Sequence, residues 1–341
     1  MKLLYKDFES RVTGKGGIDG LKEILNVEDP NDTQLLQTFR KFNESVVKTN
    51  FFKEEIGAVG YRFDPSVFMG ALKVPEIPFG IFSVIGRDFN GFHVRFRDIS
   101  RGGIRMIKST EDNYTRNQMT QFQETYALSY TQKLKNKDIT ESGSKGTILM
   151  GLGKNHQGDI SFMKYLDTLL DLMLVTEGVS SIYDAPEYLF FGPDENTALL
   201  MDPGAYYTQK KGYGPWRSIT TGKSGTLGGI PHDTYGMTTR SVRQFVQGVQ
   251  RKLGHKQSEK TKFVTGGPDG DLGSNEVLLG EESIVGIVDG SGVIYDPNGL
   301  DRKELLRLCE TRNMVDHYKA NFSDQGFFMH VDETNRTLPD G

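Results

Sequence analysis

A chain of 341 residues, with 36% hydrophobic and 25% charged residues, has the composition of an ordinary globular protein and is long enough for two domains. Its net charge of −4 gives no reason to expect nucleic acid or an anionic membrane as a partner, and no apolar run approaches the ~20 residues of a membrane helix. The single cysteine, Cys309, excludes an internal disulfide, and the N-terminus lacks the apolar core of a signal peptide. We therefore expect a soluble, cytoplasmic protein.

The first third of the chain changes from helical to β-rich sequence. Residues 1–60 are polar, and we expect a mostly helical segment without a chemical motif. Two β-rich stretches follow, GIFSVIG and FHVRFRDI, and the intervening RDFNG predicts a hairpin. In the second stretch apolar and charged residues alternate from Phe92 to Arg97, which predicts a strand with one apolar and one charged face.

Helical signals then alternate with short apolar runs. Thr110 is typical of an N-cap and predicts a long helix that ends near Asn136. The run TILMG at 147–151 predicts a buried strand, and the periodicity of residues 159–176 predicts a helix. A further helix is predicted from Thr238 to Leu253, with Gly254 just past its end. We infer an α/β fold of two domains with a boundary near 215–230.

A glycine-rich unit, KFVTGGPDGDLGSNEVLLGEESIVGIVDG, lies near the end of the chain. It predicts a strand, a turn with Gly267, Gly270 and Gly273, a helix, and a second strand that ends at Asp289. Such a unit can bind a dinucleotide, because glycines let the backbone approach a pyrophosphate and the carboxylate binds the ribose; an acid there favours NAD. The spacing departs from G-x-G-x-x-G and aspartates flank Gly270, so a plain glycine-rich turn is an equal alternative.

Other local patterns have a structural reading beside the functional one. The string TTGKSG at 220–225 is similar to the end of a P-loop, but Arg217 stands where a glycine is required, which favours a glycine-rich interdomain loop. The six histidines are scattered, so we expect no metal site.

Asp194 lies in a turn where acids are usually solvated. Lys145, between glycines and before an apolar strand, is either a loop lysine or an amine whose pKa is lowered by burial.

The chain contains four blocks whose order and spacing resemble glutamate dehydrogenase over about residues 40–335: SRGGIRM, ALSYTQKLKNKDITESGSKGTI, FFGPDENTA and TTGKSGTLGGIPHDTYGMTTRSV. The first two blocks are closer to the large NAD-specific enzymes than to the short hexameric ones. The resemblance implies a mixed-sheet α/β substrate and catalytic domain over 61–220, followed by an incomplete Rossmann-like NAD-binding domain over 221–341. The implied activity is NAD-dependent oxidative deamination of L-glutamate to 2-oxoglutarate and ammonia.

The resemblance also implies a role for individual residues of the substrate site. Arg101 stands where the family has a lysine that holds the side-chain carboxylate of the substrate; the change keeps the charge and allows bidentate binding. Lys133, twelve residues before Lys145, or its neighbour Lys135 corresponds to the lysine that binds the α-carboxylate. Lys145 matches the catalytic lysine, which would polarise an imine and activate water. Asp194 matches the catalytic aspartate, which would move protons to and from the nitrogen.

For the cofactor, the resemblance implies that Thr238 and Arg240 meet the nicotinamide end and that Asp289 binds the ribose. About two strands of a dinucleotide fold of roughly six are visible, so we expect the chain to end before that domain is complete.

Two alternatives remain at this stage: a dehydrogenase of the same family for another amino acid, and a truncated, catalytically inactive binding module. The resemblance further implies small-molecule partners (glutamate, 2-oxoglutarate and ammonium) and a homo-oligomer, usually a tetramer in the large type. The compartment stays open between the cytoplasm and, in a eukaryote, the mitochondrial matrix.

Overall fold

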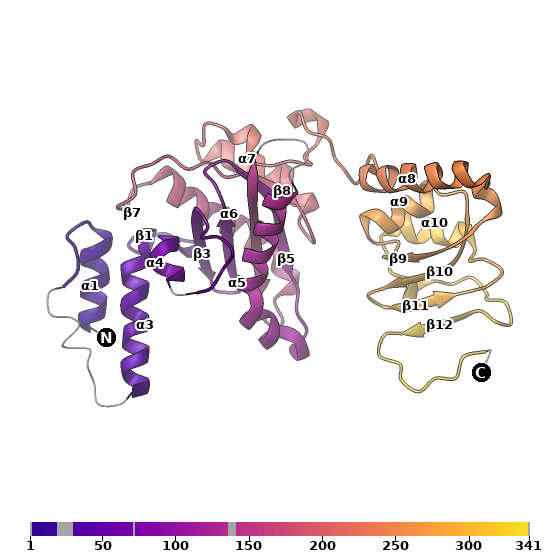
Figure 1. The fold of residues 1–341 in the computed structure, drawn as a ribbon, viewed down its shortest axis with the longest axis horizontal. Coiled ribbons are helices and arrows are strands. Elements are labelled where there is room, and N and C mark those ends of the chain that lie inside the picture. Colours follow the sequence, from indigo (N-terminus) through magenta and orange to yellow (C-terminus); the bar gives the residue numbers. More distant parts are fainter. Residues whose placement is uncertain (1, 19–29, 71, 136–140, 340–341) are drawn as a thin grey trace. The chain divides into compact units, whose positions relative to one another are not determined.

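The computed structural model describes residues 2–18, 30–70, 72–135 and 141–339, and divides into two compact units, Met1–Gly229 and Ile230–Gly341 (Figure 1). Each unit has its own sheet and apolar core. The predicted α/β class is confirmed. Over the described ranges, no helix is long and apolar enough to cross a membrane.

The first unit is built on a mixed sheet, which has eight strands in the described part of the chain, in the order β7-β1-β2-β3-β4-β6-β5-β8. Most neighbours pair antiparallel, whereas β5 pairs parallel with both β6 and β8. The strands are β1 (Val46–Thr49), β2 (Ala58–Phe63), β3 (Gly80–Gly86), β4 (Phe89–Arg95), β5 (Ser100–Ile107), β6 (Ser142–Met150), β7 (Ser180–Ser181) and β8 (Phe191–Pro193).

Helices cover both faces of this sheet: α1 (Lys2–Val12), α3 (Pro30–Ser45), α4 (Pro65–Met69), α5 (Glu111–Leu134), α6 (Gly158–Leu174) and α7 (Met201–Lys210). Alternate residues of β6 face α5 and α6, since a Cβ on Gly143 would stand 2.3 Å from the amide nitrogen of Lys133, and one on Gly146 would stand 2.9 Å from the hydroxyl of Tyr165. Every residue of β6 is therefore buried. The candidate site lies on the side of the sheet that α5 covers, at β6, β5 and β8, which are neighbours in that order.

The local signals of the sequence explain several boundaries. The predicted hairpin is β3–β4, with Ile81 opposite Val94, and the prediction is confirmed. Helix α5 begins after Thr110, whose side chain forms a capping box with Asn113, as an N-cap threonine predicts. Polar contacts fix α5 over the sheet: the hydroxyls of Thr125 and Thr147 lie 2.6 Å apart. Within residues 1–60, α1 and α3 are helical, whereas β1 and the start of β2 belong to the sheet.

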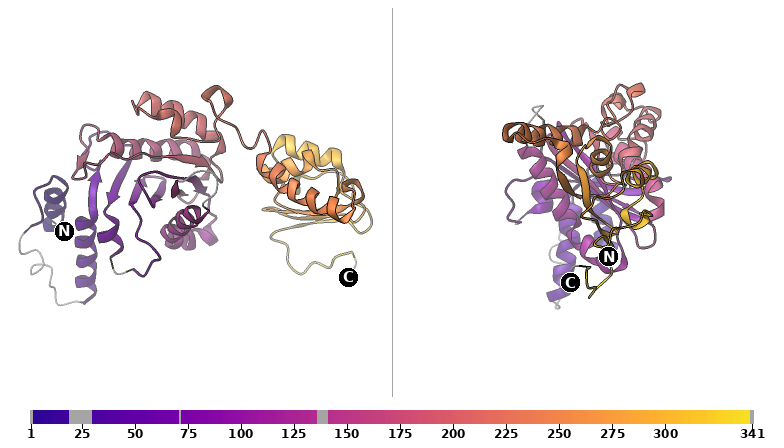
Figure 2. Two further views of the ribbon diagram at one scale, coloured as in Figure 1. Left: turned by 45° about the horizontal axis from the view of Figure 1, so that its top comes forward. Right: turned by 90° about the vertical axis from the view of Figure 1, so that its right-hand side faces the viewer.

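The second unit is smaller, and its four described strands lie in the order β12-β11-β10-β9. Strand β9 pairs parallel with β10 through the intervening α9, as the glycine-rich unit predicts, while β11 and β12 pair antiparallel. Helices α9 and α10 pack together over this sheet and share its core (Figure 2). Its elements are α8 (Met237–Leu253), β9 (Thr261–Thr265), α9 (Asp271–Leu279), β10 (Ser283–Asp289), β11 (Gly292–Tyr295), α10 (Arg302–Thr311) and β12 (Phe327–His330).

Helix α8 ends at Gly254, whose φ of +71° is the left-handed conformation expected just past a helix end. The helical spacing of Val242, Phe245, Val246 and Val249 predicts this helix and puts them on one face. That face is exposed in the second unit, where Phe245 is 77% exposed and Val249 is 60% exposed.

Candidate active site

Lys145 and Asp194 form an ion pair in the first unit, between Nζ of the lysine and Oδ2 of the aspartate. Lys145 lies on β6, on the same face as Gly143. Asp194 follows β8 directly. The two strands are not neighbours, because β5 lies between them. The predicted catalytic residues are therefore brought together across an intervening strand.

Gly103 on β5 makes this contact possible. A Cβ at this position would stand 3.0 Å from the Cβ of Asp194 and 3.2 Å from its Oδ2, closer than ordinary van der Waals contact. Thr197 holds the aspartate turn on β5, because its hydroxyl donates to the carbonyl of Ile104 (2.7 Å) and accepts from the amide of Asp194 (3.0 Å). The glycine thus leaves space for the carboxylate, and the threonine fixes the turn that carries it.

The environment of Lys145 lowers its pKa to about 8. Burial is the main cause, because a charged amine loses hydration there, and the positive charges of Arg105 and Lys135 act in the same direction. Glu124 and Glu195 partly oppose them. An amine with a pKa of about 8 is neutral in about a tenth of the molecules at pH 7 and in about half at pH 8, and the neutral form can accept a proton from water or from a substrate amine.

Arg105 is a site residue that the sequence reasoning missed. Its guanidinium lies 3.0 Å from Glu124 on α5, 3.7 Å from Oδ1 of Asp194 and 3.6 Å from Glu195. The signal that could have found it is the strand period of two, since Arg101, Gly103 and Arg105 all lie on the face of β5 that carries the ion pair. Arg105 therefore joins the aspartate turn to α5.

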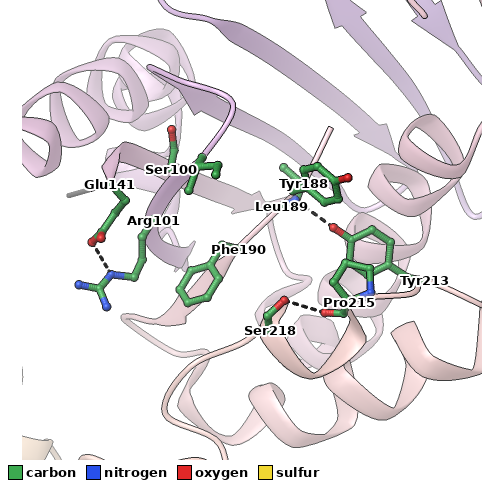
Figure 3. Close-up of a pocket in the computed structure, with 10 residues that line it drawn as sticks. Ser100, Arg101, Glu141, Tyr188, Leu189, Phe190, Tyr213, Pro215 and Ser218 are labelled. Carbon is green, nitrogen blue, oxygen red and sulfur yellow. Dashed lines mark hydrogen bonds and ion pairs between the residues drawn. The ribbon is translucent and has the colours of Figure 1, made fainter. Parts of the chain in front are cut away.

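Arg101 lies on the same face, two residues before Gly103, which is roughly 7 Å along the strand. Its Nε lies 2.8 Å from Oε1 of Glu141, the residue before β6 (Figure 3). Both line a cavity of about 310 Å³ whose other walls are mostly apolar: Ile99, Ser100, Tyr188, Leu189, Phe190, Tyr213, Pro215 and Ser218. The predicted carboxylate-binding arginine thus stands beside the ion pair and at the edge of a cavity.

The two lysines at the end of α5 differ in their surroundings. Nζ of Lys133 forms an ion pair with Glu76 and lies 5.8 Å from the ring centre of Phe96, on the β4 side of β6. Lys135, the C-cap residue, is exposed, and its charge contributes to the lowered pKa of Lys145. The charge of Lys135 therefore acts on Lys145, whereas the charged end of Lys133 is paired with Glu76.

The cofactor candidates lie in the second unit, around the turn between β9 and α9. A Cβ on Gly273 would stand 2.1 Å from the carbonyl oxygen of Gly267, and one on Gly267 would stand 2.5 Å from Oδ2 of Asp289. Gly270 precedes α9, and the nearest atom to a Cβ there would be 3.6 Å away. The turn thus requires glycine at two of the three positions and leaves open space at Gly270. Gly266, with a φ of +113°, is a further required glycine.

Carboxylates surround this turn. Burial, with repulsion from Asp289, raises the pKa of Asp269, and burial, with repulsion from Asp233, raises the pKa of Asp271. Arg312 offsets part of this charge, since its guanidinium donates to the carbonyl of Asp269 at 3.3 Å. The N-terminus of α9 and the space beside Gly270 fit a pyrophosphate. The negative charge of the surrounding aspartates, in contrast, favours a ligand with less negative charge.

Asp289, the predicted ribose ligand, is held within the protein. Its Oδ1 accepts from the amide of Ser291 at 2.9 Å, and its Oδ2 accepts from the amide of Val315 at 2.8 Å. Thr238 and Arg240 are exposed on the first turn of α8, which lies beside α9 because Thr239 donates to the carbonyl of Leu272 at 3.2 Å. All the cofactor candidates therefore lie at one end of this unit.

The described residues include no group of three or more His, Cys, Asp or Glu that could hold a metal ion.

The TTGKSG string runs beside β8 and does not form a P-loop. Thr220 pairs with Phe191 in a parallel bridge, and a three-residue 3-10 helix, Gly225–Leu227, follows instead of a long helix. A Cβ on Gly222 would stand 2.7 Å from the ring of Pro193, the residue before Asp194. The loop interpretation is therefore correct, and the loop packs against the turn that carries the aspartate.

The chain is similar in sequence to a dehydrogenase family and to curated glutamate dehydrogenases. Residues 228–337 match the family described as glutamate/leucine/phenylalanine/valine dehydrogenase. Glutamate dehydrogenase 2 of Dictyostelium discoideum is 45% identical and aligns with all of this chain and 34% of its own length. The NAD-specific glutamate dehydrogenases of Neurospora crassa and Saccharomyces cerevisiae are 46% and 45% identical over 94% and 93% of this chain. The chain spans about a third of the length of these relatives.

Solved structures show a more distant likeness. Hetero-hexameric glutamate dehydrogenase of Thermus thermophilus in its Leu-bound form is 20% identical, with a TM-score of 0.47 over 87% of this chain and 66% of that one. Plasmodium falciparum glutamate dehydrogenase is 16% identical, with a TM-score of 0.46 over 97% of this chain and 66% of that one. The resemblance read from the sequence is confirmed by the curated relatives: the chain is similar to NAD-specific glutamate dehydrogenases over nearly its whole length, and its residues 228–337 match the family described as glutamate/leucine/phenylalanine/valine dehydrogenase.

Proposed function

We propose that this chain carries the substrate site and part of the cofactor site of an NAD-dependent glutamate dehydrogenase, which converts L-glutamate to 2-oxoglutarate and ammonium. The observation that carries the proposal is the ion pair of Lys145 and Asp194, in which the pKa of the lysine is lowered to about 8. Glutamate has two carboxylates, and Arg101, a cation that can bind one of them, lies on the same face of the sheet as the ion pair. The relatives from Neurospora crassa and Saccharomyces cerevisiae are NAD-specific glutamate dehydrogenases, which supports the choice of glutamate and NAD.

In this proposal Arg101 binds the side-chain carboxylate of glutamate, and Lys135 or Lys133 binds the α-carboxylate. The surroundings of Lys135 favour it, because its charge acts on Lys145 while Lys133 is paired with Glu76. Two fixed cations orient the α-carbon and its amine toward the ion pair. The roughly 7 Å between Arg101 and Gly103 along β5 is comparable to the length of glutamate.

The chemistry divides between the two residues of the ion pair. Asp194 accepts a proton from the substrate ammonium, so that the neutral amine can become an imine as the α-carbon loses hydride. Gly267, Gly270, Gly273 and Asp289 would hold NAD, with Thr238 and Arg240 for its nicotinamide end, and the cofactor would supply the acceptor for that hydride. Lys145 then removes a proton from the water that attacks the imine carbon of 2-iminoglutarate, and Asp194 returns a proton to the departing nitrogen.

The test is the formation of NADH, measured by absorbance with the purified chain, NAD and L-glutamate, with L-leucine as the control substrate. We expect turnover with glutamate that is lost in Lys145→Ala and in Asp194→Asn, by a factor of at least ~100 in kcat. Equal turnover with leucine would identify a dehydrogenase for another amino acid. Glutamate binding without NAD binding would identify an inactive binding module.

The same proposal includes assembly into a homo-oligomer, which the resemblance to the large enzymes implies. Size-exclusion chromatography with light scattering should give a mass that is a multiple of 38.2 kDa.

A further inference from the structure

Glu141 is a carboxylate at the proposed substrate site to which the resemblance assigns no role. It lies immediately before β6, four residues before Lys145, and its Oε1 lies 2.8 Å from Nε of Arg101 (Figure 3). The side chain of Glu141 is 11% exposed and that of Arg101 is 22% exposed. Their contact is thus largely shielded from water, where an ion pair and a like-charge contact both act more strongly than at a surface.

The ion pair satisfies Glu141 only in part. Its second oxygen, Oε2, is buried and has no hydrogen-bond partner among the described residues. A buried carboxylate with an unpartnered oxygen is poorly compensated for its lost hydration. The stability of the protein therefore does not explain why a carboxylate is buried at position 141. The clearest contact of Glu141 in the described chain is with Arg101, the arginine proposed to bind substrate.

The contact is made through Nε, which has a specific geometric consequence. An acceptor on Nε restricts rotation of the planar guanidinium and so sets the direction of its two terminal nitrogens. A substrate carboxylate that binds those nitrogens then lies on the same guanidinium as Glu141. Two carboxylates on one guanidinium repel each other, and burial strengthens the repulsion.

The cavity beside the pair allows both carboxylates to be accommodated. Arg101 and Glu141 both line its volume of about 310 Å³, opposite Phe190, Tyr213 and Ser218 (Figure 3). Because the walls are mostly apolar, the cavity itself supplies little to screen the repulsion.

We propose that Glu141 is a positioning residue that orients Arg101 through Nε and whose negative charge weakens the binding of the substrate's side-chain carboxylate. The inference rests on the proposed function, because it takes Arg101 as the ligand of that carboxylate. The charge of Glu141 keeps the affinity for dicarboxylates moderate, which favours release of the dicarboxylate product.

Glu141→Gln separates the two effects, since its amide oxygen can still accept from Nε while the charge is removed. The probes are glutarate, a five-carbon dicarboxylate, and pentanoate, its monocarboxylate counterpart, with binding to the full chain measured by calorimetry. We expect Glu141→Gln to bind glutarate about tenfold tighter than the unmodified chain and pentanoate equally well. In the NADH assay KM for glutamate should fall with kcat within a factor of about two.

The matched control is Glu44→Gln, which makes the same change in an Arg–Glu pair of equal length, 2.8 Å, with Arg40 on α3. It should leave the affinity for both acids unchanged. Arg101→Leu should lose most of the glutarate affinity.

Unchanged or weaker glutarate binding in Glu141→Gln, with the loss in Arg101→Leu preserved, would overturn the inference and leave the proposed function standing. If Arg101→Leu binds glutarate as well as the unmodified chain, or neither binds it, the role of Arg101 in the proposed function fails instead. If Glu141→Gln does not fold, Glu141→Ala replaces it; failure of both to fold would make the pair a structural salt bridge and overturn the inference.

Discussion

The ion pair between Lys145 and Asp194 spans three strands, and it exists because the middle strand carries Gly103 at that level. Strand β5 pairs parallel with β6 on one side and with β8 on the other. The lysine on β6 and the aspartate after β8 approach from opposite sides, over a position without a side chain. The closeness of the two groups is thus a property of the sheet.

Gly103→Ala should disrupt the ion pair, because its Cβ would stand 3.0 Å from the Cβ of Asp194. We expect kcat for glutamate oxidation to fall about 100-fold, since a displacement of about 1 Å in a catalytic group has that scale of effect. The control is Gly214→Ala, where nothing lies within 4 Å of the new Cβ. Steady-state kinetics and a thermal unfolding curve for both variants check the prediction; normal turnover in Gly103→Ala would contradict it.

The pKa of Lys145, about 8, predicts the pH dependence of the reaction. Below this value the amine is mostly protonated and cannot accept a proton from water; above it the amine is mostly neutral. The ratio kcat/KM for glutamate should therefore rise with pH, reach half of its plateau near pH 8 and level off about one pH unit higher. A pH profile of the unmodified chain tests this, and Lys145→Ala should lose both the rate and the inflection. An inflection that survives in Lys145→Ala would belong to another group.

Lys135→Ala and Lys133→Ala should separate the two candidates for the α-carboxylate. Removal of Lys135 takes away a positive charge that lowers the pKa of Lys145, so the inflection in the pH profile should move to higher pH. KM for glutamate should also rise, by about tenfold or more for a lost charged contact. Lys133→Ala should break the pair with Glu76 and leave the inflection in place. The opposite pattern would assign the carboxylate to Lys133.

The glycines of the turn before α9 should give different results. Gly273→Ala would place a Cβ 2.1 Å from the carbonyl oxygen of Gly267, so we expect the second unit to lose stability, as measured by chemical unfolding. Gly270→Ala has 3.6 Å to its nearest neighbour and should leave stability nearly unchanged. If the pyrophosphate of NAD binds at the start of α9, Gly270→Ala should still weaken NAD binding, measured by fluorescence titration. Unchanged NAD affinity would favour a plain turn.

Much of the fold could be predicted from local sequence. The capping box at Thr110, the hairpin of β3 and β4, and the glycine after α8 each depend on residues within a few positions of one another. The end of helix α5 was also predicted closely: the helix ends at Leu134, two residues before the predicted end near Asn136. The site was harder to predict, because Arg105 and Glu141 lie within the SRGGIRM and ALSYTQKLKNKDITESGSKGTI blocks without a role assigned to them, and their importance comes from neighbours on other elements.

The sequence by itself determined the α/β class, the β9-α9-β10 unit and the residue types of the site, because periodicity, caps and required glycines act over short distances along the chain. Only the tertiary structure decided which side chains meet. The parallel pairing of β5 on both sides joins Lys145 to Asp194, and the position of α5 over β6 directs Lys133 toward Glu76. Ion pairs depend on distance in space, and strand order sets that distance independently of the spacing along the sequence.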